Sequence, residues 1–393
     1  MNQRHRLIGR RSFLFGLGSL ATMSAVATSK AAYENQQIQA LYDPDRNFII
    51  TEGFSLKERA AKKGLIYGAA ARQIDLSSNA SYAAAIVQNC SMLVPEWEFK
   101  WTAGNATLRP SPDRFDFSAA DWMANFAATH DQLLRGHTLV WHDSLPEWFK
   151  TSVNSRNAAQ LLEKHIQTVV KRYAGKIHSW DVVNEAIRTE DGRNDGWRIT
   201  PWLELLGPNY IDLAFRLTAA ADPQALLVYN DFDLDYDTPE QEAKRTAVLK
   251  LLERLQTKRT PIHAVGIQAH LFPGENKFNP SKLRKFLHDV ASMGLKIMIT
   301  EMDVADKKLP TDVKVRDRII AGVYEDYLST VLDEQAVIAV ITWGLSDRYS
   351  YVSQSQPRSD RAPVRPLPLD AQMQPKLAWN AIARAFDHAP RRN

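Results

Sequence analysis

Eight short apolar segments of strand type recur along this chain, and longer segments with the apolar spacing of a helix lie between them. Strands that alternate with helices predict parallel βαβ units, because each helix carries the chain back to the start of the next strand. Eight such units predict an α/β fold closed into a (β/α)8 TIM barrel rather than an open sheet. The predicted strands cover residues 64–70, 91–95, 132–140, 177–183, 225–229, 264–269, 296–300 and 337–342.

The segments between the predicted strands support the same fold. Thr238, Pro239 and Glu240 supply the capping residue, the first-turn proline and the acid with which helices commonly begin. No linker rich in Pro, Gly or Ser divides the chain after Gly64, so a single domain is predicted over residues 33–393. The clearest predicted helices cover residues 158–173, 210–221, 239–256, 280–293 and 315–333.

Residues 1–32 are predicted to be a signal peptide rather than part of the fold. Basic residues precede an apolar run that ends near Ala27, and small residues follow it. Arg10 and Arg11, placed just before Phe13 and Leu14, favour a twin-arginine signal, with an ordinary secretory signal as the alternative. We therefore expect the twin-arginine export machinery to be a partner, and the mature protein to be periplasmic or secreted.

Composition argues against several other partners. The predicted leader holds five of the 49 basic residues and no acid, which leaves 44 basic and 45 acidic residues in the mature chain. This balance lacks the positive charge of a nucleic-acid-binding protein. Cys90 is the only cysteine, so no internal disulfide can form, and its apolar flanks predict a buried side chain. No segment after the leader has the sequence of a membrane anchor, and we expect a monomer.

Two of the predicted strands end in a carboxylic acid. Asn184 and Glu185 follow the strand at 177–183, while Glu301 and then Asp303 follow the strand at 296–300. The carboxyl ends of all barrel strands lie at one rim, so these acids are predicted to face the same cleft. Glycoside hydrolysis needs such a pair, because one acid protonates the departing oxygen while the other attacks the sugar carbon or activates water.

Side chains at the other strand ends suit a sugar. Aromatic rings stack on pyranose faces, and Asn, Gln, His and Lys hydrogen-bond hydroxyl groups. A zinc site at His137, His142 and His270 is the alternative, but these residues lack the spacing of known zinc motifs. No Gly-rich phosphate loop is evident either, so we predict neither a metal nor another cofactor. Candidate stacking platforms are Trp97, Trp101, Trp141, Trp148, Tyr229 and Trp343.

Seven stretches of the chain are similar, in order, to glycoside hydrolase family 10, a family of retaining (β/α)8 endo-1,4-β-xylanases. They span nearly all of the chain after the leader and read PEWEFKW, RGHTLVWH, WDVVNEA, YNDF, VGIQAHL, ITEMDV and TWGLSDRYS. The resemblance implies hydrolysis of internal β-1,4-xylosidic bonds in xylan or xylo-oligosaccharides by double displacement. It also implies that Glu185 is the general acid/base and Glu301 the nucleophile.

The resemblance implies roles for the side chains around the two acids as well. His270 would hydrogen-bond Glu301 and help to keep it ionised, with Asp303 behind that pair. Glu96 would reach the next sugar toward the non-reducing end, and Tyr229 would lie on the leaving-group side. The subsite of the sugar being cleaved would be formed by Lys100, His137, Trp141, Gln268, Trp343 and Asn184, the last holding the 2-hydroxyl.

Three positions depart from the family pattern. Trp97 stands where the family usually has Asn, Ser144 where it usually has Gln, and Tyr351 where it commonly has Trp. We expect the chemistry to be intact and the subsite affinity, chain-length preference or tolerance of side groups to differ. The alternatives are a related glycosidase of cellulose or mannan, an inactive carbohydrate-binding barrel, and a structural or partner-binding barrel whose polar rim residues would not be arranged around a ligand. The RGHTLVWH and QAHL stretches count against the first, and the presence of both acids counts against the second.

Overall fold

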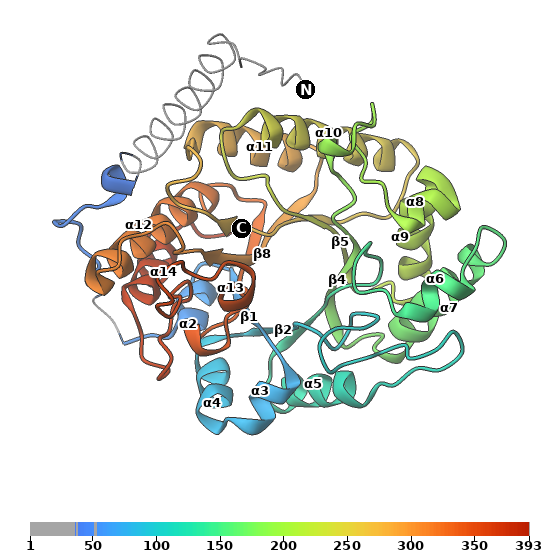
Figure 1. The fold of residues 1–393 in the computed structure, drawn as a ribbon, viewed down its shortest axis with the longest axis horizontal. Helices are drawn as coiled ribbons and strands as arrows, with labels where there is room; N and C mark the ends of the chain where they lie inside the picture. The colour runs from blue at the N-terminus through green and yellow to red at the C-terminus, as the bar shows by residue number, and fades with distance from the viewer. Residues whose placement is uncertain (1–35, 37, 51–52, 393) are drawn as a thin grey trace, which may run out of the picture.

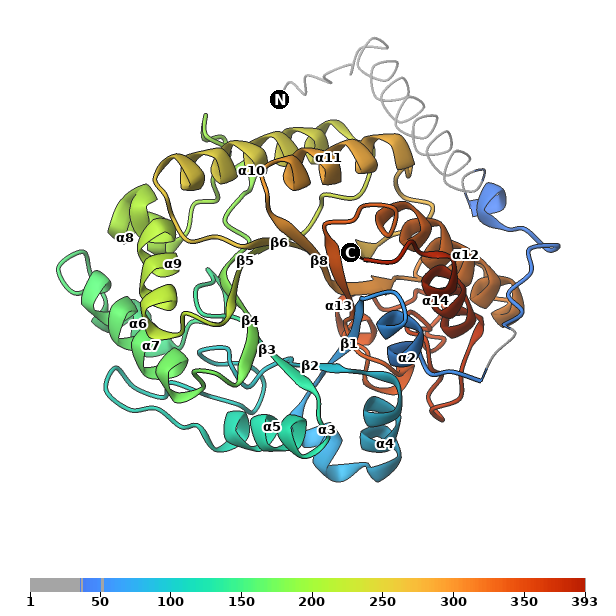
Figure 2. The ribbon, with the colours of Figure 1, turned by 180° about the vertical axis from the view of Figure 1, so that it is seen from behind.

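The computed structural model describes residues 36, 38–50 and 53–392, and it confirms the predicted barrel. Parallel strands form a ring with helices outside it (Figure 1, Figure 2). The strand order is β6-β5-β4-β3-β2-β1-β9-β8-β7, and an additional pairing of β6 with β8 closes the ring. The strands are β1 (Ile66–Ala71), β2 (Met92–Pro95), β3 (Leu133–Gly136), β4 (Ile177–Asn184), β5 (Leu226–Asp231), β6 (Ala264–Ile267), β7 (His270–Leu271), β8 (Lys296–Val304) and β9 (Val337–Thr342).

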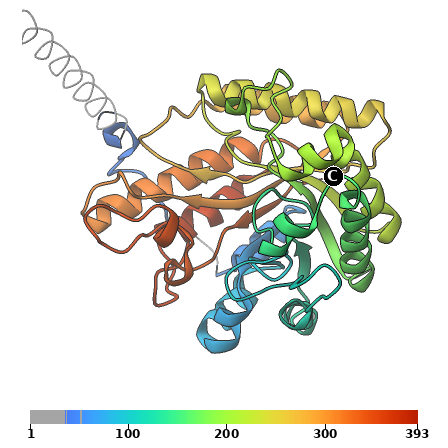
Figure 3. The same cartoon turned by 45° about the vertical axis from the view of Figure 1, so that its right-hand side comes forward.

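Helices follow the strands and surround the ring (Figure 2). The helices α10 and α11, drawn in yellow and gold, lie together along one flank of the barrel (Figure 3). The helices are α2 (Leu56–Ala61), α3 (Gln73–Ser78), α4 (Ala80–Asn89), α5 (Ser118–Thr129), α6 (Glu147–Ser152), α7 (Ala158–Arg172), α8 (Pro201–Leu206), α9 (Tyr210–Ala221), α10 (Pro239–Thr257), α11 (Pro280–Ser292), α12 (Val313–Val331), α13 (Val352–Ser355) and α14 (Leu377–His388). The predicted leader lies outside the described residues.

All eight predicted strands are present, and the differences lie at their ends. β3 is shorter than predicted, whereas β8 is longer, so that Glu301 and Asp303 lie inside the strand rather than after it. The added part of β8 follows a register shift against β9 between Ile299 and Met302. The short strand β7 pairs with this added part, and two residues are too few to give a sequence pattern.

Two apolar layers hold the barrel. The large layer lies between strands and helices and includes Cys90, whose predicted burial is confirmed because its side chain has no exposed surface. Apolar side chains of different sizes form a second, separate cluster on the other face of the strands, as expected for a barrel interior. This inner cluster consists of Ala70, Met92, Val94, Val228, Ala264, Met298, Ala339, Ile341 and Trp343.

The first and last strands of the ring, β1 and β9, lie side by side, and the helices next to them pack together. β1 pairs with β9, and α14 packs against both α12 and α2. Trp379 of α14 donates its indole N–H to Asn89 at 2.9 Å, and the backbone N–H of Arg392 donates to the carbonyl of Lys63 at 2.8 Å. The C-terminal residues are therefore part of the barrel wall. No helix in the described part of the chain combines the length and apolarity needed to cross a membrane.

Buried His165 predicts how stability changes with pH. Its ring stacks on Trp101 at 4.0 Å, has no exposed surface, and neither ring nitrogen has a hydrogen-bond partner among the described residues. Burial, aided by the charge of Arg109, lowers the pKa of His165 well below 6.5. The unfolded chain then binds a proton that the folded chain does not, so stability falls as the pH drops below about 6.5, by up to about 1.4 kcal/mol per pH unit.

His165→Leu is expected to remove this share of the acid dependence. The measurement is urea unfolding between pH 4 and 7, and the slope of unfolding free energy against pH should be shallower in the variant. His288→Leu, which removes an exposed histidine on α11, is the control. Equal slopes in wild type and His165→Leu would contradict the assignment.

Candidate active site

The two predicted acids lie at the carboxyl ends of the strands. Glu185 directly follows β4, and Glu301, 5% exposed, lies in β8. The backbone of Glu185 has φ +57°, a left-handed conformation that costs a non-glycine residue about 1–3 kcal/mol. Two contacts hold it there: its N–H donates to the carbonyl of Asn230 at 2.8 Å, and Arg198 donates to its carbonyl at 2.7 Å. Such strain, held by its surroundings, is typical of a functional residue.

Three donors fix the carboxyl group of Glu185. The indole N–H of Trp141 lies 2.9 Å from Oε2, while the side-chain amides of Gln268 and Asn184 lie 3.0 and 3.1 Å from Oε1. Burial raises the pKa of Glu185, and the charges of Asp231 and Glu301 raise it further, against the opposing hydrogen bonds from Gln268 and Trp141. Glu185 is thus the acid of the pair that retains its proton more readily.

Glu301 is held in the opposite state. Asn230 donates to Oε1 at 2.8 Å, and Nε2 of His270 lies 3.3 Å from Oε2. Burial by itself would raise the pKa of Glu301, but the His270 hydrogen bond and the nearby charges of His137, His270 and Lys100 lower it to about 2. Burial would likewise lower the pKa of His270, but Asp303, 3.1 Å from its Nδ1, raises it well above 6.5. A charged imidazolium therefore faces the Glu301 carboxylate.

Asn230 connects the surroundings of the two acids. Its side-chain amide donates both to Glu301 and, at 2.9 Å, to the amide oxygen of Asn184, which itself donates to Glu185. Thr300 donates to Asn230 Oδ1 at 2.7 Å and fixes the orientation of that amide. Gly266 leaves the space for it, because a Cβ there would lie 2.2 Å from Asn230 Oδ1. Asn230 was not among the predicted site residues, although it lies in the YNDF stretch.

The structure does not support the predicted sugar contact of Tyr229. Adjacent residues of a strand point to opposite faces, and because Asn230 points into the barrel, Tyr229 points toward the outer helices. Its side chain has no exposed surface, and its hydroxyl donates to the buried carboxylate of Asp231. Asp231 also pairs with Lys244 at 2.8 Å. Tyr229 is therefore a packing residue behind the rim.

The other predicted wall residues come together. The Lys100 ammonium lies 5.0 Å from the ring centroid of Trp141 and 5.6 Å from that of Trp343. His137 meets Trp343 edge to face, with centroids 5.3 Å apart, and its Nδ1 is 2.9 Å from Asp181. Asp181 also pairs with the buried Arg135, so the ring of His137 is oriented from below. These side chains surround the acids with one cation, one imidazole and two indoles.

Glu96 lies at the end of β2, on the other side of the barrel from β6. It is 6% exposed, and its carboxylate is 3.9 Å from the guanidinium of Arg72. Burial raises the pKa of Glu96 to about 7, although the charges of Arg72 and Lys100 act in the opposite direction. A buried carboxyl group near Lys100 suits a hydrogen bond to a sugar hydroxyl.

The three residues that depart from the family pattern lie on loops around this site. Trp97 follows Glu96, and the Arg72 guanidinium lies over its ring, 4.6 Å from the centroid. The ring of Trp97 also packs against Gly104, at a distance that leaves no space for a Cβ. Ser144 lies after β3 with φ +55°. Tyr351, 49% exposed, precedes α13 after β9. Their effect on sugar binding stays a prediction.

A groove of about 300 Å³ adjoins the catalytic residues. His270 and Asp303 contribute to its floor, and the segment from Tyr351 to Gln356 forms one side. The loop after β9 therefore begins at the edge of the site. The lining consists of Phe232, Asp233, His270, Phe272, Asp303, Ala305, Tyr351, Val352, Ser355 and Gln356.

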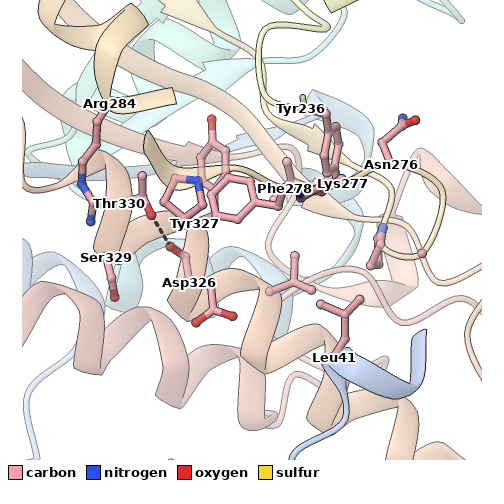
Figure 4. A pocket seen from close by; sticks show the side chains of 15 residues that line it. Leu41, Tyr236, Asn276, Lys277, Phe278, Arg284, Asp326, Tyr327, Ser329 and Thr330 are labelled. Atoms are coloured by element: carbon pink, nitrogen blue, oxygen red, sulfur yellow. Dashed lines mark hydrogen bonds between the residues drawn. The ribbon is translucent and has the colours of Figure 1, made fainter. Parts of the chain in front are cut away.

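A second hollow of about 530 Å³ lies outside the ring, with Arg284 of α11 and Tyr327 of α12 in its walls (Figure 4). Phe278 and Tyr236 line it, and Leu41 from the N-terminal segment borders it. Its lining contains a single acid, Asp326, whose carboxylate is paired with Arg46 at 2.7 Å. This hollow lacks the paired acids that the rim of the barrel has, so the chemistry belongs to the rim.

The geometry and electrostatics together define a class of protein. Two carboxyl groups on separate barrel strands have pKa values displaced in opposite directions, and aromatic and hydrogen-bonding side chains surround them. The described residues contain no group of three or more His, Cys, Asp or Glu side chains placed to hold a metal ion. A proton donor and an ionised carboxylate that face one sugar-binding cleft are the pair of acids that a retaining glycoside hydrolase uses.

Residues 55–385 match the sequence profile of Glycosyl hydrolase family 10, and the chain belongs to that family. It is 36% identical over 317 residues to endo-1,4-beta-xylanase A of Caldicellulosiruptor sp. (strain Rt8B.4), an alignment that covers 76% of this chain and 43% of that protein. The crystal structure of native xylanase 10B from Thermotoga maritima superposes with a TM-score of 0.76 at 32% identity, over 85% of this chain and 98% of that one. Xylanase 10B from Thermotoga petrophila RKU-1 in complex with xylobiose gives 0.75 at 30% identity, over 86% and 99%.

Proposed function

We propose that this chain is an endo-1,4-β-xylanase that cleaves internal bonds of xylan with retention of configuration. The opposed pKa shifts of Glu185 and Glu301 carry the proposal, because a retaining enzyme needs one protonated and one ionised acid at the start. The names of the relatives and the xylobiose in one structural neighbour support xylan as the substrate.

The first step forms a glycosyl-enzyme. Ionised Glu301 attacks the anomeric carbon while Glu185 gives its proton to the departing glycosidic oxygen. Positive charge develops on the sugar ring in the transition state, and the Glu301 carboxylate balances it. Asn184, already fixed by Asn230, offers the position from which the 2-hydroxyl is held.

The second step uses the same residues in reverse. Glu185, now ionised, takes a proton from water, which attacks the anomeric carbon and releases Glu301. Two displacements at the same carbon restore its original configuration. The hydrogen bonds from Gln268, Trp141 and Asn184 to Glu185 are best satisfied by its ionised form and therefore suit its role as base in this step.

The proposal is tested by product analysis. The mature chain is incubated with soluble xylan, cellulose and mannan in parallel, and reducing ends are counted. Proton NMR of the first xylan products then reads the anomeric configuration before mutarotation. We expect cleavage of xylan alone and initial release of the β-anomer. Initial release of the α-anomer, or faster cleavage of cellulose or mannan, would overturn it.

The pH profile tests the role of His270 as a positioning residue. Activity requires Glu301 to be ionised, so in the wild type the acid limb reflects a pKa near 2. His270→Asn removes the charged donor to Glu301, so the pKa of Glu301 rises. As the pH is lowered, the variant therefore loses activity earlier, at a higher pH than the wild type. We expect the acid limb of kcat/KM on an aryl β-xylobioside to move up by about one pH unit or more. A limb that does not move would contradict the role of His270.

We further propose that residues 1–32 direct export through the twin-arginine route to the periplasm or the medium. We also propose that the mature protein is a monomer. The paired arginines Arg10 and Arg11 support this route. Replacing both with lysine should retain the precursor in the cytoplasm, as read by cell fractionation and xylanase assay, whereas unchanged export would favour an ordinary secretory signal. Light scattering of the mature protein tests the oligomeric state.

A further inference from the structure

We propose that Asp233 makes the leaving-group side of the cleft selective for neutral sugars and against sugars that carry a carboxylate side group. The inference rests on the proposed function, because it concerns the substrate class of the same site. It assigns a specificity role to a residue that contributes nothing to the reaction itself.

The groove beside His270 lies on the leaving-group side. Glu96, on the side of the non-reducing end, follows β2, whereas the groove is lined from the loops after β5, β6 and β9 and from the end of β8. In the closed ring β2 and β6 stand opposite each other, with β3, β4 and β5 on one side and β1, β9 and β8 on the other. A chain that runs from Glu96 across the two acids therefore enters this groove with its next sugars.

Asp233 presents an accessible carboxylate to the groove. It lies in the loop after β5 with φ +55°, its side chain is exposed, and it lines the groove with Phe232. Its contact with a side chain is weak, since the amide of Gln241 is 3.5 Å from Oδ1. No ion pair of Asp233 is present among the described residues, because the nearby Lys244 is bound to Asp231 at 2.8 Å. The carboxylate therefore has unused capacity to accept hydrogen bonds.

No other residue of the lining forms an ion pair with Asp233. His270 and Asp303 compensate each other at 3.1 Å, and the remaining lining residues are aromatic, aliphatic, hydroxyl or amide side chains. Lys307, outside the lining, has its ammonium 3.3 Å from the side-chain oxygen of Gln356. The groove thus combines aromatic surfaces with one carboxylate that has no ion-pair partner among the described residues. Neutral sugar hydroxyls can donate to that charge, while a carboxylate side group is repelled by it.

The test separates charge from shape. Asp233→Asn keeps the size and a hydrogen-bonding oxygen but removes the charge. The substrates are linear xylohexaose and xylohexaose bearing one uronic-acid group, with the reducing end labelled in ¹⁸O so that mass spectrometry locates the cut. Two values of kcat/KM are compared. The first is for cleavages of the decorated substrate that leave the decorated unit on the leaving-group side, and the second is for cleavage of the linear substrate. The readout is the ratio of the first to the second. Glu240→Gln, an exposed acid on α10 outside the groove, is the control.

We expect the ratio to rise about three- to tenfold in Asp233→Asn and to stay unchanged in Glu240→Gln, as removal of one partly solvated like charge predicts. Added salt should raise the ratio in the wild type and have little effect in the variant. A ratio that is the same in wild type and Asp233→Asn, or a salt effect that persists in the variant, would overturn the inference. Neither result bears on the proposed function, which in this experiment would be contradicted by a different outcome, the absence of cleavage of linear xylohexaose itself.

Discussion

Replacement of Glu301 with alanine is expected to lower kcat on soluble xylan by about 10⁴-fold or more. The nucleophile of the first displacement is then gone, and no other acid in the described part of the chain is placed to replace it, because Asp303 is bound to His270. The cavity left by the side chain admits a small anion. Added azide is expected to restore bond cleavage on an activated aryl β-xylobioside and to give the α-glycosyl azide, since only one displacement then occurs.

The measurement is initial rate with and without azide, together with NMR of the product. Glu253→Ala, an exposed acid on α10, is the matched control and should keep wild-type rates. Circular dichroism checks that Glu301→Ala is folded. A variant that retains more than about 1% of the wild-type rate on xylan, or that yields the β-azide, would remove Glu301 from the nucleophile's role.

Replacement of Glu185 with alanine is expected to give a loss that depends on the leaving group. The xylan bond needs a proton on its departing oxygen, so kcat/KM on xylan should fall by about 10²–10⁴-fold. The dinitrophenolate of a dinitrophenyl xylobioside leaves without protonation, so kcat/KM on this substrate should fall much less. Its turnover should nevertheless be slow, because the base of the second step is also missing, and the glycosyl-enzyme on Glu301 should accumulate as a burst.

The pH dependence provides an independent check on Glu185. In the wild type activity falls as the pH rises through the raised pKa of Glu185, because the proton donor is lost. In Glu185→Ala this basic limb should disappear for the dinitrophenyl substrate. Azide should accelerate the second step in this variant and give the β-azide, in contrast to Glu301→Ala. An equal loss on both substrates would contradict the acid role.

The barrel and its two acids could be predicted because their signals are local. Each strand is a short apolar run with helical spacing on either side, and Glu185 and Glu301 stand where such a run ends. The placement of Glu301 inside β8 could not be predicted, because it depends on a register shift against β9 that no local pattern marks. β7 also arises only because that extension exists for it to pair with.

The face of the sheet to which a strand residue points was harder to predict than the strands themselves. Tyr229 and Asn230 are neighbours in one apolar run, and an aromatic residue at a strand end suggests a stacking platform. In the structure Asn230, not Tyr229, points into the barrel. Gly266 on the neighbouring strand leaves space for the side chain of Asn230, so that Tyr229 must point to the opposite face. That space depends on a residue 36 positions further along the chain, as the pairing of Asn230 with Gly266 shows. Loop residues such as Asp233 are harder still, since tertiary contacts position them.

The closure of the ring by its two ends has a consequence for biosynthesis. α2 can acquire α14 only after residues up to His388 have left the ribosome, and β1 can acquire β9 as its neighbour only after residues up to Thr342 have left it. Until β9 is available, both edges of the open sheet, at β1 and β8, remain exposed to other chains together with their apolar faces. The barrel can therefore be completed only near the end of synthesis. A chain cut short before α14 is expected to be a substrate for chaperones and proteases rather than a weaker enzyme.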